Sequence, residues 1–227
     1  MSQSANKRIA KNTLFIYIRT FVVLVVSLYT SRLVLEALGA EDLGIYNVVG
    51  GIVALMSFFQ SAQTRATSRF ITYELGLGEG YKQLQKVFSI CMTIHILLAL
   101  VVVIIGETVG LWIMTHFTDI PLERQTAAMY VYQFSLLLFC IHIIRVPYDA
   151  VVIAHEQMSM FAYMSILEAL LQLGLLFIVM HCGVDSLILY SGLMAGAALI
   201  LLVAYYVYVK KNFSIYKYSF TWDKSIS

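Results

Sequence analysis

Four ionisable side chains stand inside long apolar runs of this sequence. Arg145 and Asp149 are four residues apart in "IHIIRVPYDAVVIAHE". Glu168 lies in the next apolar run, and Arg19 lies in the first one. An arginine binds phosphate through paired N–H donors, and a carboxylate either holds an arginine or takes a proton. Because ionisable groups are costly inside a bilayer, each of these residues is a candidate functional residue.

Each candidate also has a purely structural interpretation. Arg145 and Asp149 would neutralise each other as an i, i+4 pair beside a helix kink at Pro147. Arg19 lies about 8 Å into its run, so its long side chain would still reach water. Glu168 lies about 12 Å from the start of its run, too deep for a short acidic side chain to reach the surface. All four fall in the half of the membrane that we predict to be cytoplasmic.

The composition places these charges in a membrane protein. The chain has 227 residues and is 60% hydrophobic but only 12% charged, with a mean hydropathy of +0.83. Soluble domains carry about twice that charged fraction. The start is polar and basic, without a secretory cleavage site, so the first apolar run is predicted to remain as a membrane helix. The three cysteines form no CxxC pair, so neither a disulfide framework nor a zinc site is predicted.

Six apolar stretches are long enough to cross a bilayer, because about 20 helical residues span roughly 30 Å. They lack the alternation of period two that barrel strands show. We therefore predict an all-α membrane protein, a six-transmembrane-helix bundle. The helices are expected over about 14–35, 43–62, 87–110, 127–154, 160–181 and 186–209. They form one lobe over 1–209, followed by a basic, aromatic cytoplasmic linker or tail over 210–227.

Basic residues set the predicted orientation, because Lys and Arg are enriched in cytoplasmic loops. With the N-terminus inside, the outer loops contain only Arg124. Both termini are therefore expected in the cytoplasm. The other basic residues outside the spans are then cytoplasmic: Lys7, Arg8, Lys11, Arg65, Arg69, Lys82, Lys86, Lys210, Lys211, Lys217 and Lys224. The longest cytoplasmic segment, 63–86, is interpreted as a flexible polar connector.

Glycines and histidines in the spans carry weaker signals. Gly50, Gly51 and Gly192 are of the type that lets membrane helices pack closely. His95 and His142 have the chemistry for a proton relay. A hydrogen bond to a neighbouring helix is the competing interpretation for each histidine.

Three stretches carry a family resemblance: "SRLVLEALGAEDLGIYNVVGGIVALMSFF", "ATSRFITYELG" and "FCIHIIRVPYDAVVIAHEQMSMFAYMSILEALLQL". With them, nearly the whole chain resembles the polysaccharide-transport (O-antigen flippase) branch of the superfamily that also contains multidrug antiporters and lipid II flippases. The resemblance implies a flippase that moves an undecaprenyl-pyrophosphate-linked oligosaccharide across the bacterial cytoplasmic (inner) membrane. The cargo would be a lipopolysaccharide O-antigen or capsular polysaccharide repeat.

The same resemblance implies two six-helix lobes that alternate access around a central cavity. This chain supplies one lobe, so the second is expected from a C-terminal half or from another copy. In such a transporter Arg19 and Arg145 would bind the pyrophosphate. Asp149 and Glu168 would hold the arginines in the empty site or take a coupling proton. The expected partners are the lipid-linked oligosaccharide, the membrane and the second lobe, with no cofactor, metal, nucleic acid or enzymatic activity.

Three other functions stay open at this point. A cation-coupled multidrug antiporter would favour an acidic site, and here the deep charges have both signs. A membrane enzyme of polysaccharide assembly, such as a polymerase or ligase, would need a larger extracytoplasmic loop than the longest one here, about 111–126. A membrane scaffold of polysaccharide assembly would co-purify with a glycosyltransferase without binding glycolipid.

Overall fold

A computed structural model describes residues 3–54, 57–78, 80–213, 215, 216 and 218. All regular structure in these residues is helical, and they contain no strand. The predicted all-α class is therefore confirmed. The elements are α1 (Gln3–Ala54), α2 (Ser57–Leu77), α3 (Tyr81–Ile105), a π-helical turn (Gly106–Gly110), α4 (Leu111–Phe117), a 3-10 turn (Leu122–Arg124), α5 (Gln125–Ala154), α6 (Met158–His181) and α7 (Ser186–Asn212).

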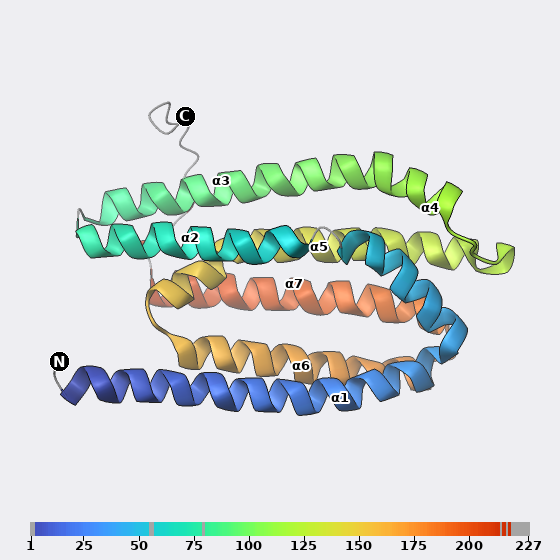
Figure 1. The fold of residues 1–227 in the computed structure, drawn as a ribbon, viewed down its shortest axis with the longest axis horizontal. Coiled ribbons are helices and arrows are strands. Elements are labelled where there is room, and N and C mark those ends of the chain that lie inside the picture. Colours follow the sequence, from blue (N-terminus) through green and yellow to red (C-terminus); the bar gives the residue numbers. More distant parts are fainter. Residues whose placement is uncertain (1–2, 55–56, 79, 214, 217, 219–227) are drawn as a thin grey trace.

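Helix α1 bends back on itself at Gly39. The φ of 76° and ψ of 173° at this residue interrupt the helix, and a glycine adopts this conformation without a Cβ clash. The arm of α1 before Gly39 runs the length of the bundle, and the arm after it turns back towards α2 (Figure 1). The bend therefore turns one continuous helix into the first crossing and half of the second.

The chain crosses the bundle in alternating directions. The end of α1 and α2 together make the second crossing, α3 and α4 make the third, and α5, α6 and α7 make one each (Figure 1). The start of α1 and the end of α7 consequently lie at the same end. Among the described residues, five helical segments are long and apolar enough to cross a membrane: Ile9–Gly51, Tyr81–His116, Leu122–Ala154, Met158–His181 and Ser186–Asn212. These helices fit a multi-pass membrane protein.

The predicted span over 43–62 and the flexible connector over 63–86 need correction. The helical part of the second crossing continues through α2 to Leu77, and only residues 78–80 separate α2 from α3. Gly78 and Gly80 have positive φ values, which turn the chain there. The polar and charged residues of α2 lower its average hydropathy, although Thr67 and Ile71 are buried in the bundle.

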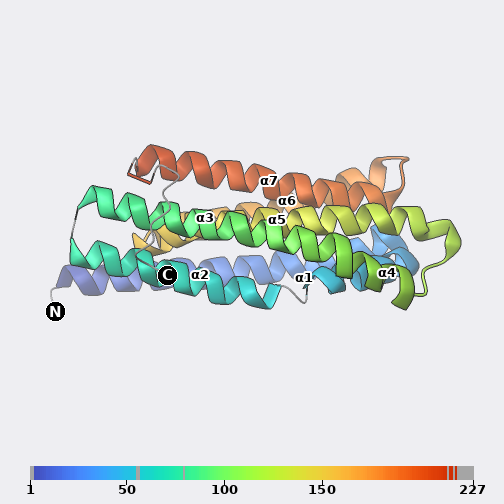
Figure 2. The same cartoon turned by 90° about the horizontal axis from the view of Figure 1, so that it is seen from above.

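Helix α5 is the centre of the bundle and contacts α1, α2, α3, α6 and α7. Its mainly apolar sequence suits burial on most sides. Val131 and Tyr132 belong to one hydrophobic cluster, which also includes residues of α1, α3 and α7. Val151 belongs to a second cluster with residues of α2, α3 and α7. Figure 2 shows α1 and α2 along one side of the bundle and α7 along the opposite side.

Charge divides the two ends of the bundle. At the end that contains the start of α1 and the end of α7, the described helix termini carry Lys7, Lys11, Lys82, Lys86, Lys210 and Lys211. We call this the basic end. At the opposite, acidic end, the bends and turns carry Glu36, Glu41, Asp42, Asp119, Glu123 and Asp185. The bundle is therefore electrically asymmetric along its length.

Candidate functional site

Arg145, Asp149 and Glu168 meet between α5 and α6. Arg145 Nη1 donates to both carboxylate oxygens of Glu168, at 3.3 and 3.2 Å. Its Nε donates to Oδ2 of Asp149 at 3.3 Å. His142 Nε2 lies 3.9 Å from Oε1 of Glu168. We call these four residues the interior cluster; it contains three of the four predicted site residues.

Two helices position the interior cluster. His142, Arg145 and Asp149 occupy one side of α5 at spacings of three and four residues, the spacing of neighbours on a helix surface. Helix α5 remains one helix through Pro147, and its last turns slope towards α6 in Figure 1. Glu168 lies about 15 Å along α6 from Met158 at 1.5 Å per residue. The cluster is therefore well inside the bundle rather than at its basic end.

The interior cluster is poorly exposed and carries an excess of acid. The Arg145 and Asp149 side chains are 14% and 13% exposed, and that of Glu168 is 24% exposed. One guanidinium faces two carboxylates, and the Tyr205 ring lies 5.7 Å from the guanidinium carbon. Oδ1 of Asp149 is buried and makes no hydrogen bond of good geometry in the described part of the chain. With both acids ionised and His142 neutral, the cluster has a net charge of about −1.

This charge balance differs from the cationic site that the sequence predicts at Arg145. The guanidinium is already neutralised by Asp149 and Glu168. An anion reaching Arg145 would first have to displace a carboxylate or meet a protonated one. The cluster is thus better suited to exchanging a proton or cation than to attracting a diphosphate.

Arg19 does not join the interior cluster. Its guanidinium lies over the Phe161 ring of α6, 4.9 Å from the centroid, as in a cation–π pair. Phe161 precedes Glu168 by about 10 Å along the helix axis. Nε of Arg19 is buried without a hydrogen-bond partner in the described residues. In the described residues, Arg19 thus makes no hydrogen bond or ion pair with the interior cluster.

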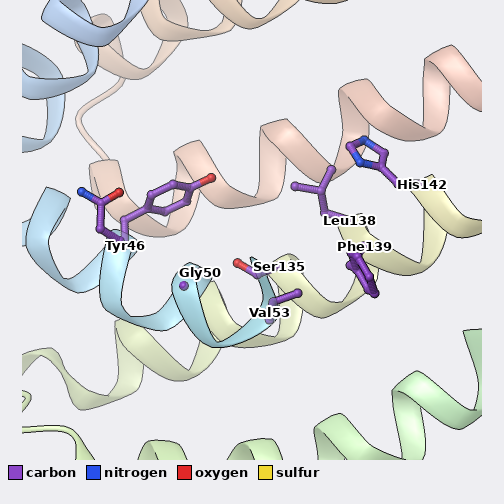
Figure 3. A pocket seen from close by; sticks show the side chains of 9 residues that line it. Tyr46, Gly50, Val53, Ser135, Leu138, Phe139 and His142 are labelled. Atoms are coloured by element: carbon purple, nitrogen blue, oxygen red, sulfur yellow. The ribbon is translucent and has the colours of Figure 1, made fainter. Parts of the chain in front are cut away.

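A cavity borders the interior cluster. It has a volume of ≈ 360 Å³ and lies between the second arm of α1 and α5 (Figure 3). Its polar lining comes from Tyr46, Asn47, Ser135 and His142. Because His142 also faces Glu168, it connects the cavity to the cluster. Sequence reasoning missed this cavity, whose only local signal is the polar pair Tyr46 and Asn47 before two glycines.

The glycines predicted to allow close packing mostly do not do so. A Cβ atom at Gly50 or Gly51 would meet no atom within 4 Å. The close approaches occur at two other glycines in the π-helical turn. A Cβ at Gly106 would lie 2.8 Å from a Leu136 methyl carbon, and a Cβ at Gly110 would meet the Tyr132 hydroxyl. The π-helical turn is therefore packed on α5 through its glycines.

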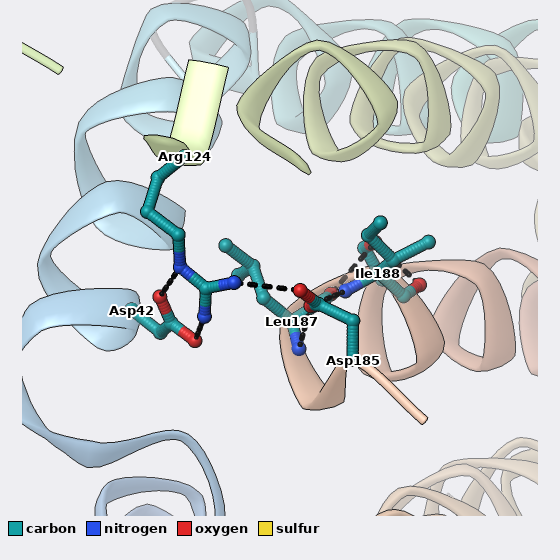
Figure 4. A network of polar contacts seen from close by, with 6 residues as sticks. Asp42, Arg124, Asp185, Leu187 and Ile188 are labelled. Atoms are coloured by element: carbon teal, nitrogen blue, oxygen red, sulfur yellow. Dashed lines mark hydrogen bonds and ion pairs between the residues drawn. The ribbon is translucent and has the colours of Figure 1, made fainter. Parts of the chain in front are cut away.

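A second polar network fastens the acidic end (Figure 4). Arg124 binds both oxygens of Asp42 and donates from Nη1 to Oδ2 of Asp185 at 2.6 Å. Oδ1 of Asp185 in turn accepts from the N–H groups of Leu187 and Ile188, which caps α7. We call Asp42, Arg124 and Asp185 the end clamp. It joins the second arm of α1 to the starts of α5 and α7.

The segment after α7 folds back on the basic end. Tyr216 is 5% exposed, and its hydroxyl lies 2.8 Å from Nε2 of His155. The Phe213 ring stacks on the His155 ring at a centroid distance of 4.2 Å. Burial lowers the pKa of His155 and raises the pKa of Tyr216. The first residues of the predicted linker or tail therefore pack against the loop between α5 and α6.

Comparisons with known proteins give no match for this chain. No protein-family model, curated protein or solved structure matches it. Its function must therefore be argued from the sequence pattern and the site geometry.

Proposed function

We propose that the chain is a membrane transport lobe of the polysaccharide-flippase type. The observation that carries the proposal is the interior cluster: ionisable side chains from two apolar helices meet deep in the bundle, beside a polar cavity. Buried charges in membrane helices mark transport pathways and proton relays. The substrate, an undecaprenyl-diphosphate-linked oligosaccharide, follows from the sequence resemblance. The basic end would face the cytoplasm of a bacterial inner membrane.

The interior cluster would act as a switch between two charge states. With both carboxylates ionised, Arg145 joins α5 to α6. Protonation of Glu168 would weaken its bonds to Arg145 and change how the two helices pack. Such a two-state element is what alternating access requires. No covalent chemistry is needed, because the lipid chain stays in the bilayer while the sugar crosses.

A second six-helix lobe would complete the pathway. In a two-lobe transporter the substrate cavity lies between the lobes, and here the cavity that contains Tyr46 and Asn47 would open towards it. The first arm of α1 exposes large apolar side chains, such as Phe21 and Leu28. These would face lipid or the second lobe, which either a C-terminal half or another copy would provide.

A cation-coupled multidrug antiporter is the second candidate, and a specific observation favours it. Two carboxylates face one guanidinium in the interior cluster, and His142 adds a further titratable group. Acid in excess inside a membrane suits a cationic substrate or proton. The two candidates share the cluster and differ in what the cavity carries.

Deleting the gene tests the proposal. We expect lipid-linked oligosaccharide to accumulate on the cytoplasmic side and surface glycan to fall, with both changes reversed by the intact gene. Sensitivity to cationic dyes without accumulation would instead assign the antiporter. Loss of glycan polymerisation or ligation, with normal translocation, would favour a membrane enzyme of polysaccharide assembly. Co-purification of a glycosyltransferase without binding of the glycolipid would favour a scaffold.

A further inference from the structure

The outward face of α2 carries two arginines that are unpaired in the described part of the chain. Arg65 and Arg69 are exposed one helical turn apart, and neither makes an ion pair or hydrogen bond in the described structure. The next turn exposes Tyr73, which is 65% exposed. Residues four apart on a helix present their side chains on the same face. We call Arg65, Arg69 and Tyr73 the α2 basic face.

The α2 basic face lies inside the bundle length rather than beyond its end. Ile71 of α2 shares a core cluster with Ala150 and Val151 of α5, and the two helices run in the same direction (Figure 1). Arg65 and Arg69 precede Ile71 by about 9 and 3 Å along the helix axis, away from the basic end. Two guanidinium groups that are unpaired in the described residues therefore lie within the length of the bundle.

Lipid chains alone are a poor environment for this face. A charged side chain in the hydrocarbon region is costly unless it reaches water, an anion or another polar group. Helix α2 is also absent from the segments that are apolar enough to cross a membrane. Its outward face, on the same side of the bundle as the first arm of α1 (Figure 2), therefore calls for a hydrated or anionic neighbour.

Charge decides which groups would bind a diphosphate. The interior cluster has more acid than base, so it repels an anion while both acids are ionised. The α2 basic face has two positive charges and, among its own residues, no acid to neutralise them. Guanidinium groups pair with phosphate oxygens through two N–H donors, and the Tyr73 hydroxyl adds another donor.

We propose that the α2 basic face is the binding site for the diphosphate of the lipid-linked substrate. Arg65 and Arg69 hold the diphosphate, and the interior cluster is left to proton or cation exchange. This assignment rests on the proposed flippase function and differs from the prediction that Arg19 and Arg145 bind the anion. It separates anion binding on α2 from the charge switch between α5 and α6.

Binding of undecaprenyl diphosphate to the purified full chain in lipid nanodiscs tests the assignment. The variant Arg65→Gln/Arg69→Gln is expected to weaken binding about tenfold or more, because charged hydrogen bonds are lost. Lys210→Gln/Lys211→Gln is the matched control: it removes two positive charges from the basic end, outside the α2 basic face, and should change affinity less than about threefold. Arg65→Lys/Arg69→Lys should bind with intermediate affinity, because charge remains without the planar donor pair.

Three results would overturn the assignment. Equal losses in the glutamine variant and the lysine control would show a general attraction to the basic end. Unchanged binding in a folded glutamine variant would remove α2 from the site. If phosphatidylglycerol or inorganic pyrophosphate competes with an affinity equal to that of undecaprenyl diphosphate, the site recognises any phosphate group rather than this lipid diphosphate. The binding test does not require transport. If binding depends on Arg65 and Arg69 but the gene deletion causes no translocation defect, the flippase function is rejected while the binding site stands.

Discussion

The end clamp and the interior cluster use the same chemistry for different purposes. In each, one arginine lies between two carboxylates from separate parts of the chain. The clamp has bonds of 2.8 and 2.6 Å from Arg124 to Asp42 and Asp185, and Asp185 also caps α7. The interior bonds from Arg145 are longer, at 3.2 to 3.3 Å, and Oδ1 of Asp149 lacks a hydrogen bond of good geometry in the described residues.

The difference between the two sites indicates which can change partners. Asp42 accepts from Arg124 with both carboxylate oxygens, and Asp185 also caps α7. Opening the end clamp would therefore leave several polar groups without partners at once. The interior cluster lies beside a cavity and includes a histidine, so its charges have alternative states. The clamp therefore holds the lobe together, and the cluster is the part able to switch.

Arg124→Gln should have the largest effect on stability. It leaves Asp42, which is 7% exposed, without its counter-charge and frees the cap residue of α7. We expect the free energy of unfolding to fall by about 2–3 kcal/mol, which is less than for a fully buried pair because Arg124 is partly exposed. Thermal unfolding in detergent measures this. Arg32→Gln is the control, an exposed arginine near the same end, and an equal loss there would reject a specific role for the clamp.

Gly110→Ala tests the close packing of the π-helical turn on α5. The added methyl group would meet the Tyr132 hydroxyl, which donates to the Gly106 carbonyl oxygen at 2.7 Å. We expect the free energy of unfolding to fall by about 1–3 kcal/mol, because the site is overpacked and the hydrogen bond is displaced. Gly50→Ala, beside the cavity, should be neutral within about 0.5 kcal/mol. Equal unfolding temperatures for both variants would contradict the packing described for the π-helical turn.

Arg145→Ala separates switching from folding. It leaves Asp149 and Glu168 without the charge that joins them, so the charge switch is lost. We expect translocation of lipid-linked oligosaccharide per folded molecule to fall about tenfold or more, while membrane insertion stays near wild type. Cell-surface glycan and detergent-extracted protein are measured together. Wild-type export by a properly inserted variant would remove Arg145 from the mechanism.

The smallest expected effect is a pH dependence at the basic end. Burial lowers the pKa of His155 below its usual 6.5, so the packed state favours the neutral ring. The stability of this contact is therefore present above about pH 6.5 and is lost as the pH falls through the lowered pKa. The protection of the Phe213 and Tyr216 amides against hydrogen exchange, corrected for the intrinsic exchange rate at each pH, should decrease on acidification. In His155→Phe this decrease should disappear, and its persistence would assign the effect to another group.

Apolar length made the bundle predictable from the sequence. Hydropathy located most of the crossing helices, and the spacing of Arg145 and Asp149 placed them on one face. The depth of Glu168 in its apolar run predicts that its side chain faces the protein interior, where it contacts Arg145. Helix α2 was missed because its buried face is short and its polar residues lower the average hydropathy.

The end clamp could not be found by spacing. Arg124 bonds to Asp42 across 82 positions and to Asp185 across 61, so only the tertiary fold brings them together. The glycines show the same limit. Those in "VVGG" look like packing residues but border open space, whereas Gly110 is close to Tyr132 only because α5 returns beside it. Arg19 and Arg145 have the same charge and lie in the same predicted half of the membrane. Depth does not determine which helices face each other, so it does not determine whether the two side chains meet.

Translocation in proteoliposomes distinguishes the proposed switching role of the interior cluster from the structural role of the end clamp. A fluorescent undecaprenyl-diphosphate oligosaccharide would be followed for the wild-type protein, Glu168→Gln and Asp42→Asn, each scaled to the amount of folded protein. We expect Glu168→Gln to unfold at the wild-type temperature but to translocate about tenfold or more slowly, whereas Asp42→Asn should be less stable and translocate normally per folded molecule. Wild-type translocation by Glu168→Gln would show that the interior cluster is not the switch.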